Sequence, residues 1–173
     1  MKRLFTTDYK DYEADWPRSA RPSARGIILI DNISDYSTLA PHDKIALVYS
    51  TKHQFYKFPG GGIHEGEENT TALIREVTEE TSVKNLKVLG DGKIMTIDAL
   101  PVAGHMKRGK YVSAHVHFSA AYIFEADENE PIQIKPDENS KVAWVPLDKV
   151  VELSTEPHMK PAYQKLVDIA KTL

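Results

Sequence analysis

The sequence contains no cysteine among its 173 residues. This absence excludes disulfide bonds, thiolate catalysis, and zinc or iron–sulfur centres held by cysteine, so any metal ion must use oxygen or imidazole ligands. The sequence also lacks an apolar run long enough to span a bilayer, and residues 1–12 lack the apolar core of a signal peptide. We therefore expect a cytoplasmic protein with no membrane partner.

A strong charge of either sign is also missing. Lysine and arginine total 22 against 25 aspartates and glutamates, which leaves a net charge of −3. Bulk charge therefore gives no reason to expect a nucleic-acid partner. The 41% of hydrophobic residues and 27% of charged residues are typical of a globular chain with one hydrophobic core.

The chain divides into two parts by composition. Residues 1–23 are polar and aromatic, without a clear period, and we interpret them as an N-terminal arm that lies over the domain or over a partner subunit. A loosely ordered tail is the alternative interpretation. Residues 24–173 contain no linker and no internal repeat, which predicts a single domain.

Short runs of apolar and β-branched residues predict several strands, and two segments have the period of a helix. The predicted strands are 26–30, 44–50, 54–58, 86–97 with a turn at 90–92, 111–125 and 142–145. The predicted helices are 67–81 and the segment after Pro161. This order predicts an α/β fold in which a mixed sheet carries helices on both faces.

The first predicted helix has an acidic face. Glu76, Glu79 and Glu80 are spaced i, i+3 and i+4, so their side chains share one arc, and Leu73 and Val77 occupy the neighbouring arc. Three carboxylates at this spacing repel one another, near the helix end where negative charge is disfavoured. A bound divalent cation would reverse that effect, and Mg²⁺ prefers such oxygen ligands.

Three glycines, Gly60–Gly62, precede this helix. Their small size permits close approach of the backbone, so a carbonyl oxygen there can serve as a further ligand. We expect Glu67 and Glu68 in the first helical turn, where acidic residues are favoured. We also expect an ion pair between Glu67 and Arg75.

The spacing of these residues resembles the Nudix box, G-x5-E-x7-R-E-U-x-E-E-x-G-U, in which U is a bulky aliphatic residue. Gly61, Glu67, residues 75–80 and Val83 occupy the defined positions. The sequence departs from the pattern at Ser82, where the box has glycine, and this puts the geometry of the helix exit in question. The flanking segments 21–27 and 56–59 resemble a bacterial, MutT-like branch of the family.

The resemblance implies a Nudix α/β/α sandwich with a central mixed β-sheet, and a box that binds a divalent metal ion. It implies Glu76, Glu79, Glu80 and the Gly60 carbonyl as ligands of Mg²⁺, with Mn²⁺ as a substitute. It also implies that Arg75 holds Glu76 in place. The implied reaction is attack of water on a phosphorus atom of a nucleoside diphosphate linked to another group, as in nucleoside triphosphates, ADP-ribose or nucleotide sugars.

The general base is not fixed by the resemblance, because family members take it from the box or from a later loop. Glu138, upstream of the predicted strand 142–145, is the outside candidate, and Glu125, Glu128 and Glu130 compete with it. For each of these four acids a solvated surface position is the alternative.

Phosphate groups of the substrate need cationic partners, and we predict Lys57 and Arg25 for this task. The basic turn 107–110 is a further candidate, or else a solvated hairpin tip. His115 and His117 share one strand face, where a pocket wall or a solvent-facing surface is favoured over a second metal site.

Two functions remain open at this point. The first is a pyrophosphohydrolase acting on a small-molecule nucleotide, and the second is a Nudix-like domain that binds nucleotides for regulation without hydrolysis. The intact glutamates favour the first. Isomerases of this fold use a catalytic cysteine, which is missing here. Many relatives form dimers, so a homodimer is a hypothesis.

Overall fold

The computed structural model describes residues 23–30, 44–50, 55–102, 104–107, 109–127, 129–134, 139–154, 157 and 159–172. Its main feature is an eight-stranded sheet with the order β10-β2-β1-β9-β5, in which β3 pairs with β2, β4 with β1 and β6 with β9. The strands of this sheet are β1 (Ser23–Ile30), β2 (Lys44–Ser50), β3 (Phe55–Lys57), β4 (Gly60–Gly62), β5 (Lys87–Val88), β6 (Thr96–Val102), β9 (His115–Ala126) and β10 (Asn139–Pro146).

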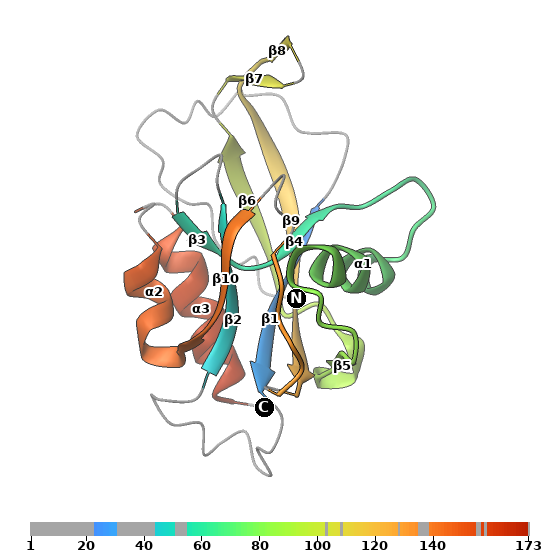
Figure 1. Cartoon of the computed structure of the whole chain (residues 1–173). Coiled ribbons are helices and arrows are strands. Elements are labelled where there is room, and N and C mark those ends of the chain that lie inside the picture. Colours follow the sequence, from blue (N-terminus) through green and yellow to red (C-terminus); the bar gives the residue numbers. More distant parts are fainter. Residues whose placement is uncertain are drawn as a thin grey trace.

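The sheet is mixed, as expected. β1 and β9 run parallel over the whole of β1, whereas the other pairs are antiparallel. Two further strands, β7 (His105–Lys107) and β8 (Lys110–Val112), form a separate hairpin that extends beyond one end of the sheet (Figure 1).

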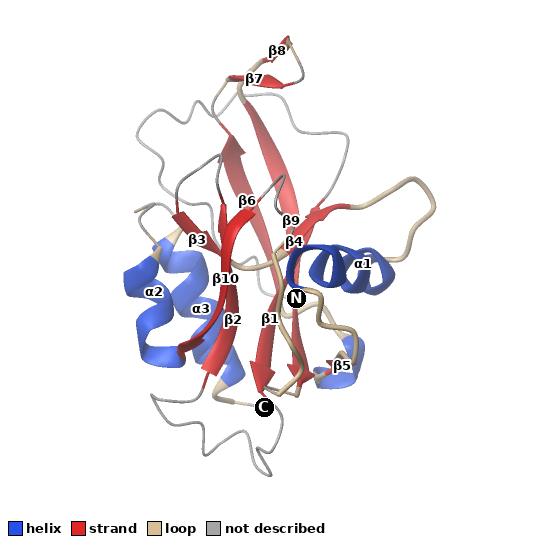
Figure 2. Ribbon diagram, viewed as in Figure 1, coloured by secondary structure: helices blue, strands red, loops and turns tan. Residues whose placement is uncertain are grey.

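Helices cover both faces of the sheet. α1 (Asn69–Thr81) lies on one face, and the short α2 (Val150–Leu153) and α3 (Lys160–Ala170) lie on the other (Figure 2). Alternate residues of β9 serve the two layers, since Phe124 packs with Leu73 of α1 and Ile123 packs with Leu166 of α3. Burial of each such side chain stabilises the fold by about 2 kcal/mol. The predicted α/β/α sandwich is confirmed.

The C-terminal helix is also held to the sheet by a buried ion pair. Lys165 of α3 donates to the carboxylate of Asp98 in β6, and the Thr96 hydroxyl donates to the same carboxylate at 2.9 Å. Asp98 is almost fully buried, so its charge requires these partners.

Three predictions about local structure were wrong in detail. Helix α1 begins at Asn69, so Glu67 and Glu68 lie before the first turn. In the predicted strand 86–97 the turn at residues 90–92 is present, with positive φ angles, but the flanking strands are only β5 before it and β6 after it, and β6 continues to Val102. The predicted strand 111–125 is broken between β8 and β9.

Several predicted features lie outside the described residues. These are residues 1–22 of the N-terminal arm and the acids Glu128 and Glu138. The boundary between an arm and a domain at residue 23 therefore stays a prediction. In the part of the chain that is described, no helix has the length and apolar character needed to cross a membrane.

Candidate active site

The glycine turn is fixed on both sides by the core of the domain. β4 pairs with β1 so that Gly60 lies opposite Arg25, and the Gly26 amide donates to the Pro59 carbonyl at 3.0 Å. The preceding Phe58 is buried against Tyr163 of α3, with ring centroids 4.3 Å apart. The turn therefore has a rigid base on which the charged side chains of α1 are arranged.

Arg75 connects most of the charged groups. Its Nε and Nη2 atoms donate to the two carboxylate oxygens of Glu67, each at 2.9 Å, and Nη2 also donates to the Gly62 carbonyl at 3.1 Å. Its Nη1 atom donates to Glu76 at 2.8 Å. The predicted ion pair between Glu67 and Arg75 is confirmed, and it joins the loop before α1 to the middle of the helix.

The hydrogen bonds between Glu67 and Arg75 shift the pKa values of both residues. The hydrogen bonds from the Arg75 side chain and from the His64 amide lower the pKa of Glu67 from 4.5 to about 2. The same contact with Glu67 raises the pKa of Arg75 above its ordinary value. Both groups therefore keep their charges throughout the neutral pH range.

Glu76 lies directly over the glycine turn. A Cβ atom at Gly61 would overlap the Glu76 carboxylate, so only glycine leaves room for this side chain in its present position. Arg75 donates a hydrogen bond to this carboxylate, and the backbone of Gly61 in β4 packs against its other side.

Glu80 is the most buried of the three glutamates, at 3% exposed. Its Oε1 atom accepts from Lys57 Nζ at 2.6 Å, and its Oε2 atom accepts from the Gly60 amide at 2.9 Å. Lys57 was predicted as a phosphate ligand from its position before the glycines. Its contact with Glu80, which lies 23 residues further along the chain, was not predicted.

Glu79 projects from the same face and is the most open of the three, with 43% of its side chain exposed. Its Oε1 atom lies 3.8 Å from Arg75 Nη1. Of the predicted ligands, Glu76 and Glu80 contact the glycine turn, whereas Glu79 lies beside Arg75 on the same side of α1.

The residues fit a divalent cation by their chemistry. Mg²⁺ prefers oxygen ligands, which the glutamate carboxylates and the backbone carbonyls of the glycine turn can supply. Within the described ranges, however, no three acidic or imidazole side chains already converge on one point. The carboxylates are paired with Arg75 and Lys57 instead, so binding of a cation would require side-chain movement.

The helix exit resolves the question raised by Ser82. Ser82 adopts the left-handed conformation, with φ 65° and ψ 3°, and its amide donates to the Thr78 carbonyl. This is the conformation for which glycine is favoured at the end of a helix. The serine therefore adopts the conformation for which the box has glycine, and α1 ends as it would with glycine at this position.

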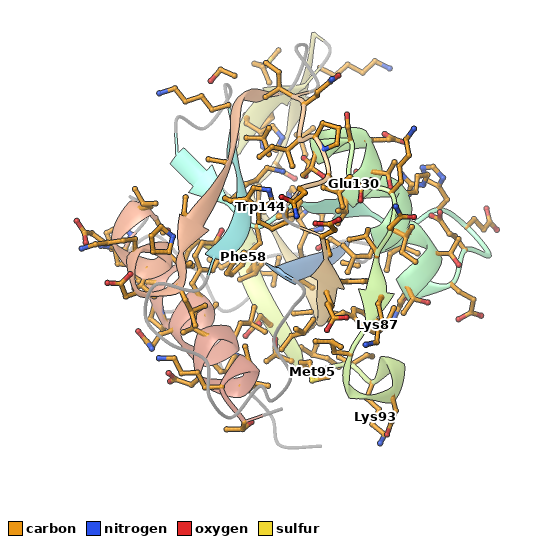
Figure 3. All side chains as sticks on the ribbon, turned by 60° about the horizontal axis from the view of Figure 1, so that its bottom comes forward. Phe58, Lys87, Lys93, Met95, Glu130 and Trp144 are labelled. Carbon is orange, nitrogen blue, oxygen red and sulfur yellow. The ribbon has the colours of Figure 1, made fainter. Side chains whose placement is uncertain are left out.

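The other acids that were considered as a general base have different partners. Glu125 pairs with Lys87 at 3.0 Å across β9 and β5. Glu130 lies beside the segment that follows α1, where its carboxylate accepts from the amides of Lys84 and Asn85 (Figure 3). The first contact joins two strands and the second supports a loop, and neither involves the region around Gly60.

The two histidines of β9 face the same way, as predicted. Their Nε2 atoms lie 3.0 Å apart, and His115 Nδ1 lies 2.7 Å from the Ser113 carbonyl. Odd-numbered residues of β9 face the α3 layer, so His115 and His117 lie on the side of the sheet opposite α1. The basic turn 107–110 is the tip of the β7–β8 hairpin.

A pocket of about 530 Å³ lies at the edge strand β10. Its walls come from β10 and from the segment before it, namely Ile132, Gln133, Ile134, Lys141, Val142 and Ala143. The Gln133 amide donates to the Thr81 carbonyl, which ties this segment to the end of α1. Across the sheet, Val142 pairs with Val48, and Val48 pairs with Lys57. The pocket is therefore connected directly to the elements of the charged site.

An arginine-organised set of glutamates beside a glycine turn, on a mixed sheet between two helical layers, defines the class of Nudix-type hydrolases. The family model described as the NUDIX domain matches residues 21–166. The chain belongs to this family. It is a hydrolase that acts on diphosphate bonds, and the alternative of a purely regulatory domain is not favoured.

The chain is similar in sequence to RNA pyrophosphohydrolases of bacteria. An RNA pyrophosphohydrolase of Agrobacterium fabrum is 35% identical over 127 residues, which cover 69% of this chain and 73% of the relative. An RNA pyrophosphohydrolase of Brucella anthropi is 34% identical over 122 residues, which cover 66% of this chain and 68% of the relative.

Solved structures support the fold. A Nudix hydrolase from M. smegmatis, RenU, superposes with a TM-score of 0.63 at 15% identity and covers 93% of this chain and 97% of its own. A C. elegans Ap4A hydrolase has a TM-score of 0.61 at 16% identity and covers 88% of this chain and 99% of its own. Members of the family generally use divalent metal ions.

Proposed function

We propose that this protein catalyses the Mg²⁺-dependent hydrolysis of a diphosphate linkage attached to a nucleoside. The observation that carries this proposal is the contact of Glu76 and Glu80 with the glycine turn, with Glu79 on the same side of α1 and with Arg75 and Lys57 as partners of these carboxylates. Folding stability alone would not favour three neighbouring carboxylates, whereas a bound cation would.

Each residue has a proposed role in the reaction. Glu76, Glu79, Glu80 and the Gly60 carbonyl would hold the metal ion, with Mg²⁺ preferred and Mn²⁺ as a substitute. When bound, the ion would neutralise phosphate oxygens and lower the pKa of the attacking water. Arg75 orients Glu76 through their direct hydrogen bond.

The water proton needs a carboxylate acceptor near the metal-binding side chains. Glu79 is the candidate within the box, because its side chain is the most exposed of the three, at 43%. Glu138, outside the described residues, stays the prediction for a base from outside the box.

We propose the 5′ end of RNA as the first substrate to consider, ahead of free nucleotides. The support is the activity named for the relatives at 34–35% identity. The net charge of −3 led us to expect no nucleic-acid partner, but an RNA end needs only its terminal phosphates and nucleoside to enter the site.

The carboxylates provide the test of this proposal. Glu79→Gln and Glu80→Gln each remove one negative charge with almost no change of shape, and each is expected to lower kcat at least ~100-fold. The measurement is Mg²⁺-dependent turnover, with circular dichroism to show that the variants stay folded. Glu152→Gln is the matched control. Glu152 lies in α2 and forms a surface ion pair with Lys149, which precedes the helix, so this variant should retain full activity. Unchanged turnover in both box variants would overturn the proposed roles.

A further inference from the structure

We propose that Lys57 is an exchangeable counter-cation of Glu80, which a divalent metal ion displaces and which then becomes available to a substrate phosphate. This inference rests on the proposed function. The Lys57 ammonium lies 2.6 Å from Glu80 Oε1, so it occupies a coordination position that a metal ion on the same carboxylate would need. The two cations therefore compete for one carboxylate.

The burial of Glu80 explains why it needs a partner at all times. Only 3% of the residue is exposed, and an unpaired carboxylate at such a position is strongly destabilising. The Gly60 amide satisfies Oε2 at 2.9 Å, but an amide does not neutralise the charge. Lys57 supplies the missing positive charge, and a metal ion would supply it in turn.

Lys57 combines a fixed main chain with a side chain that can move. Its backbone belongs to β3 and is followed at once by Phe58, which is buried against Tyr163, so the main chain is fixed. Its side chain is 24% exposed and has a flexible four-carbon stem, so the ammonium can leave Glu80 without moving the strand. Arg75 differs, because it has several simultaneous hydrogen bonds to Glu67, Glu76 and Gly62.

A displaced Lys57 ammonium would move from Glu80 toward the substrate. A divalent ion held by Glu80 would repel an ammonium at contact distance, so the Lys57 ammonium would be released to pair with another negative charge. In the proposed reaction that charge is the substrate diphosphate. The exchange therefore couples metal binding to phosphate binding, and it reconciles the ion pair seen in the structure with the phosphate-binding role predicted from the sequence.

Metal affinity in the absence of substrate tests the exchange. Lys57→Met removes the competing charge and keeps the stem, and we expect it to bind Mn²⁺ on the order of tenfold more tightly than the unchanged protein. Electron paramagnetic resonance of free Mn²⁺ measures this affinity directly. Lys57→Arg keeps the charge and should leave the affinity close to its original value.

Lys87→Met is the matched control. It also breaks a lysine–glutamate pair, that of Lys87 with Glu125 at 3.0 Å, but at the β5 end of the sheet. It should leave Mn²⁺ affinity unchanged. In thermal unfolding, Lys57→Met should lower the Tm in the presence of a chelator, and saturating Mn²⁺ should remove that difference.

Steady-state kinetics give the third measurement. Loss of the phosphate contact in Lys57→Met should raise KM more than it lowers kcat. Unchanged or weaker Mn²⁺ binding by Lys57→Met would overturn the exchange, even if the protein hydrolyses its substrate normally. Tighter Mn²⁺ binding without any hydrolysis would sustain the exchange and contradict the proposed function instead.

Discussion

At the scale of single residues, the site depends on the close fit between Gly61 and Glu76. Gly61 lies in β4, where alanine has allowed backbone angles, so its requirement for glycine comes from the carboxylate above it. Because that carboxylate is the end of a flexible side chain, it can move aside at small cost in stability. Its displacement would still disturb the contact with Arg75 and the proposed metal position.

Gly61→Ala should therefore separate activity from stability. We expect kcat/KM to fall about 10- to 100-fold, as for residues that orient metal ligands, while the free energy of unfolding changes by less than about 1 kcal/mol. Gly92→Ala should affect stability and not activity. Gly92 has φ +69°, which strains an alanine, and a Cβ atom there would meet only the Val88 side chain, at 3.9 Å. This variant should lose about 1–2 kcal/mol of stability and keep its activity. Full activity of Gly61→Ala would contradict the assigned position of Glu76.

The sequence predicted some residue contacts and missed others for a physical reason. The pair of Glu67 and Arg75 follows from spacing near a helix and was predicted. The pair of Lys57 and Glu80 depends on how β3 is placed beside α1, which is a property of the folded sheet and not of local spacing. Burial of Glu80 likewise has no signal in a polar helix face.

At the scale of elements, α1 requires a left-handed residue at its end. Ser82 meets this requirement at φ 65°, although an L-residue other than glycine pays about 1–2 kcal/mol for that conformation. The exit is further fixed by Thr78, whose hydroxyl donates to the Val83 carbonyl at 2.9 Å. Serine in place of the box glycine therefore lowers the stability of the helix end, while the helix still ends at the same residue.

Ser82→Gly should stabilise the protein. Relief of the left-handed strain outweighs the extra backbone entropy of glycine, so we expect a gain of roughly 0.5–1 kcal/mol in urea unfolding. A destabilised Ser82→Gly protein would show that the serine side chain contributes more than its backbone strain costs.

The elements with a clear period were predicted, and those without one were missed. Apolar runs indicated β1 and β2, and helical spacing indicated α1 and α3. β4 consists only of glycine, so no side-chain pattern marks it as a strand. The interruption between β5 and β6 arises from positive φ angles at residues 90–92, which a simple turn signal did not distinguish from a bend within one strand.

At the scale of the whole molecule, the sheet brings together segments that are distant in sequence. Pairing of β4 with β1 and of β3 with β2 places the glycine turn beside α1, and the β10 pocket adjoins the same elements. The buried pair of Asp98 and Lys165 fixes the opposite helical layer to β6. The charged site therefore rests on a rigid support, and its adjustable parts are the side chains.

The most direct test of the central claim is the release of phosphate or pyrophosphate from a panel of substrates, with Mg²⁺ and with a chelator. The panel would contain RNA with a 5′-triphosphate, nucleoside triphosphates, ADP-ribose, nucleotide sugars and dinucleoside polyphosphates. We predict turnover that is lost with the chelator and restored by Mg²⁺ or Mn²⁺, with the highest kcat/KM on the RNA end. Equal release with the chelator, or no release from any substrate with either metal ion, would contradict the account.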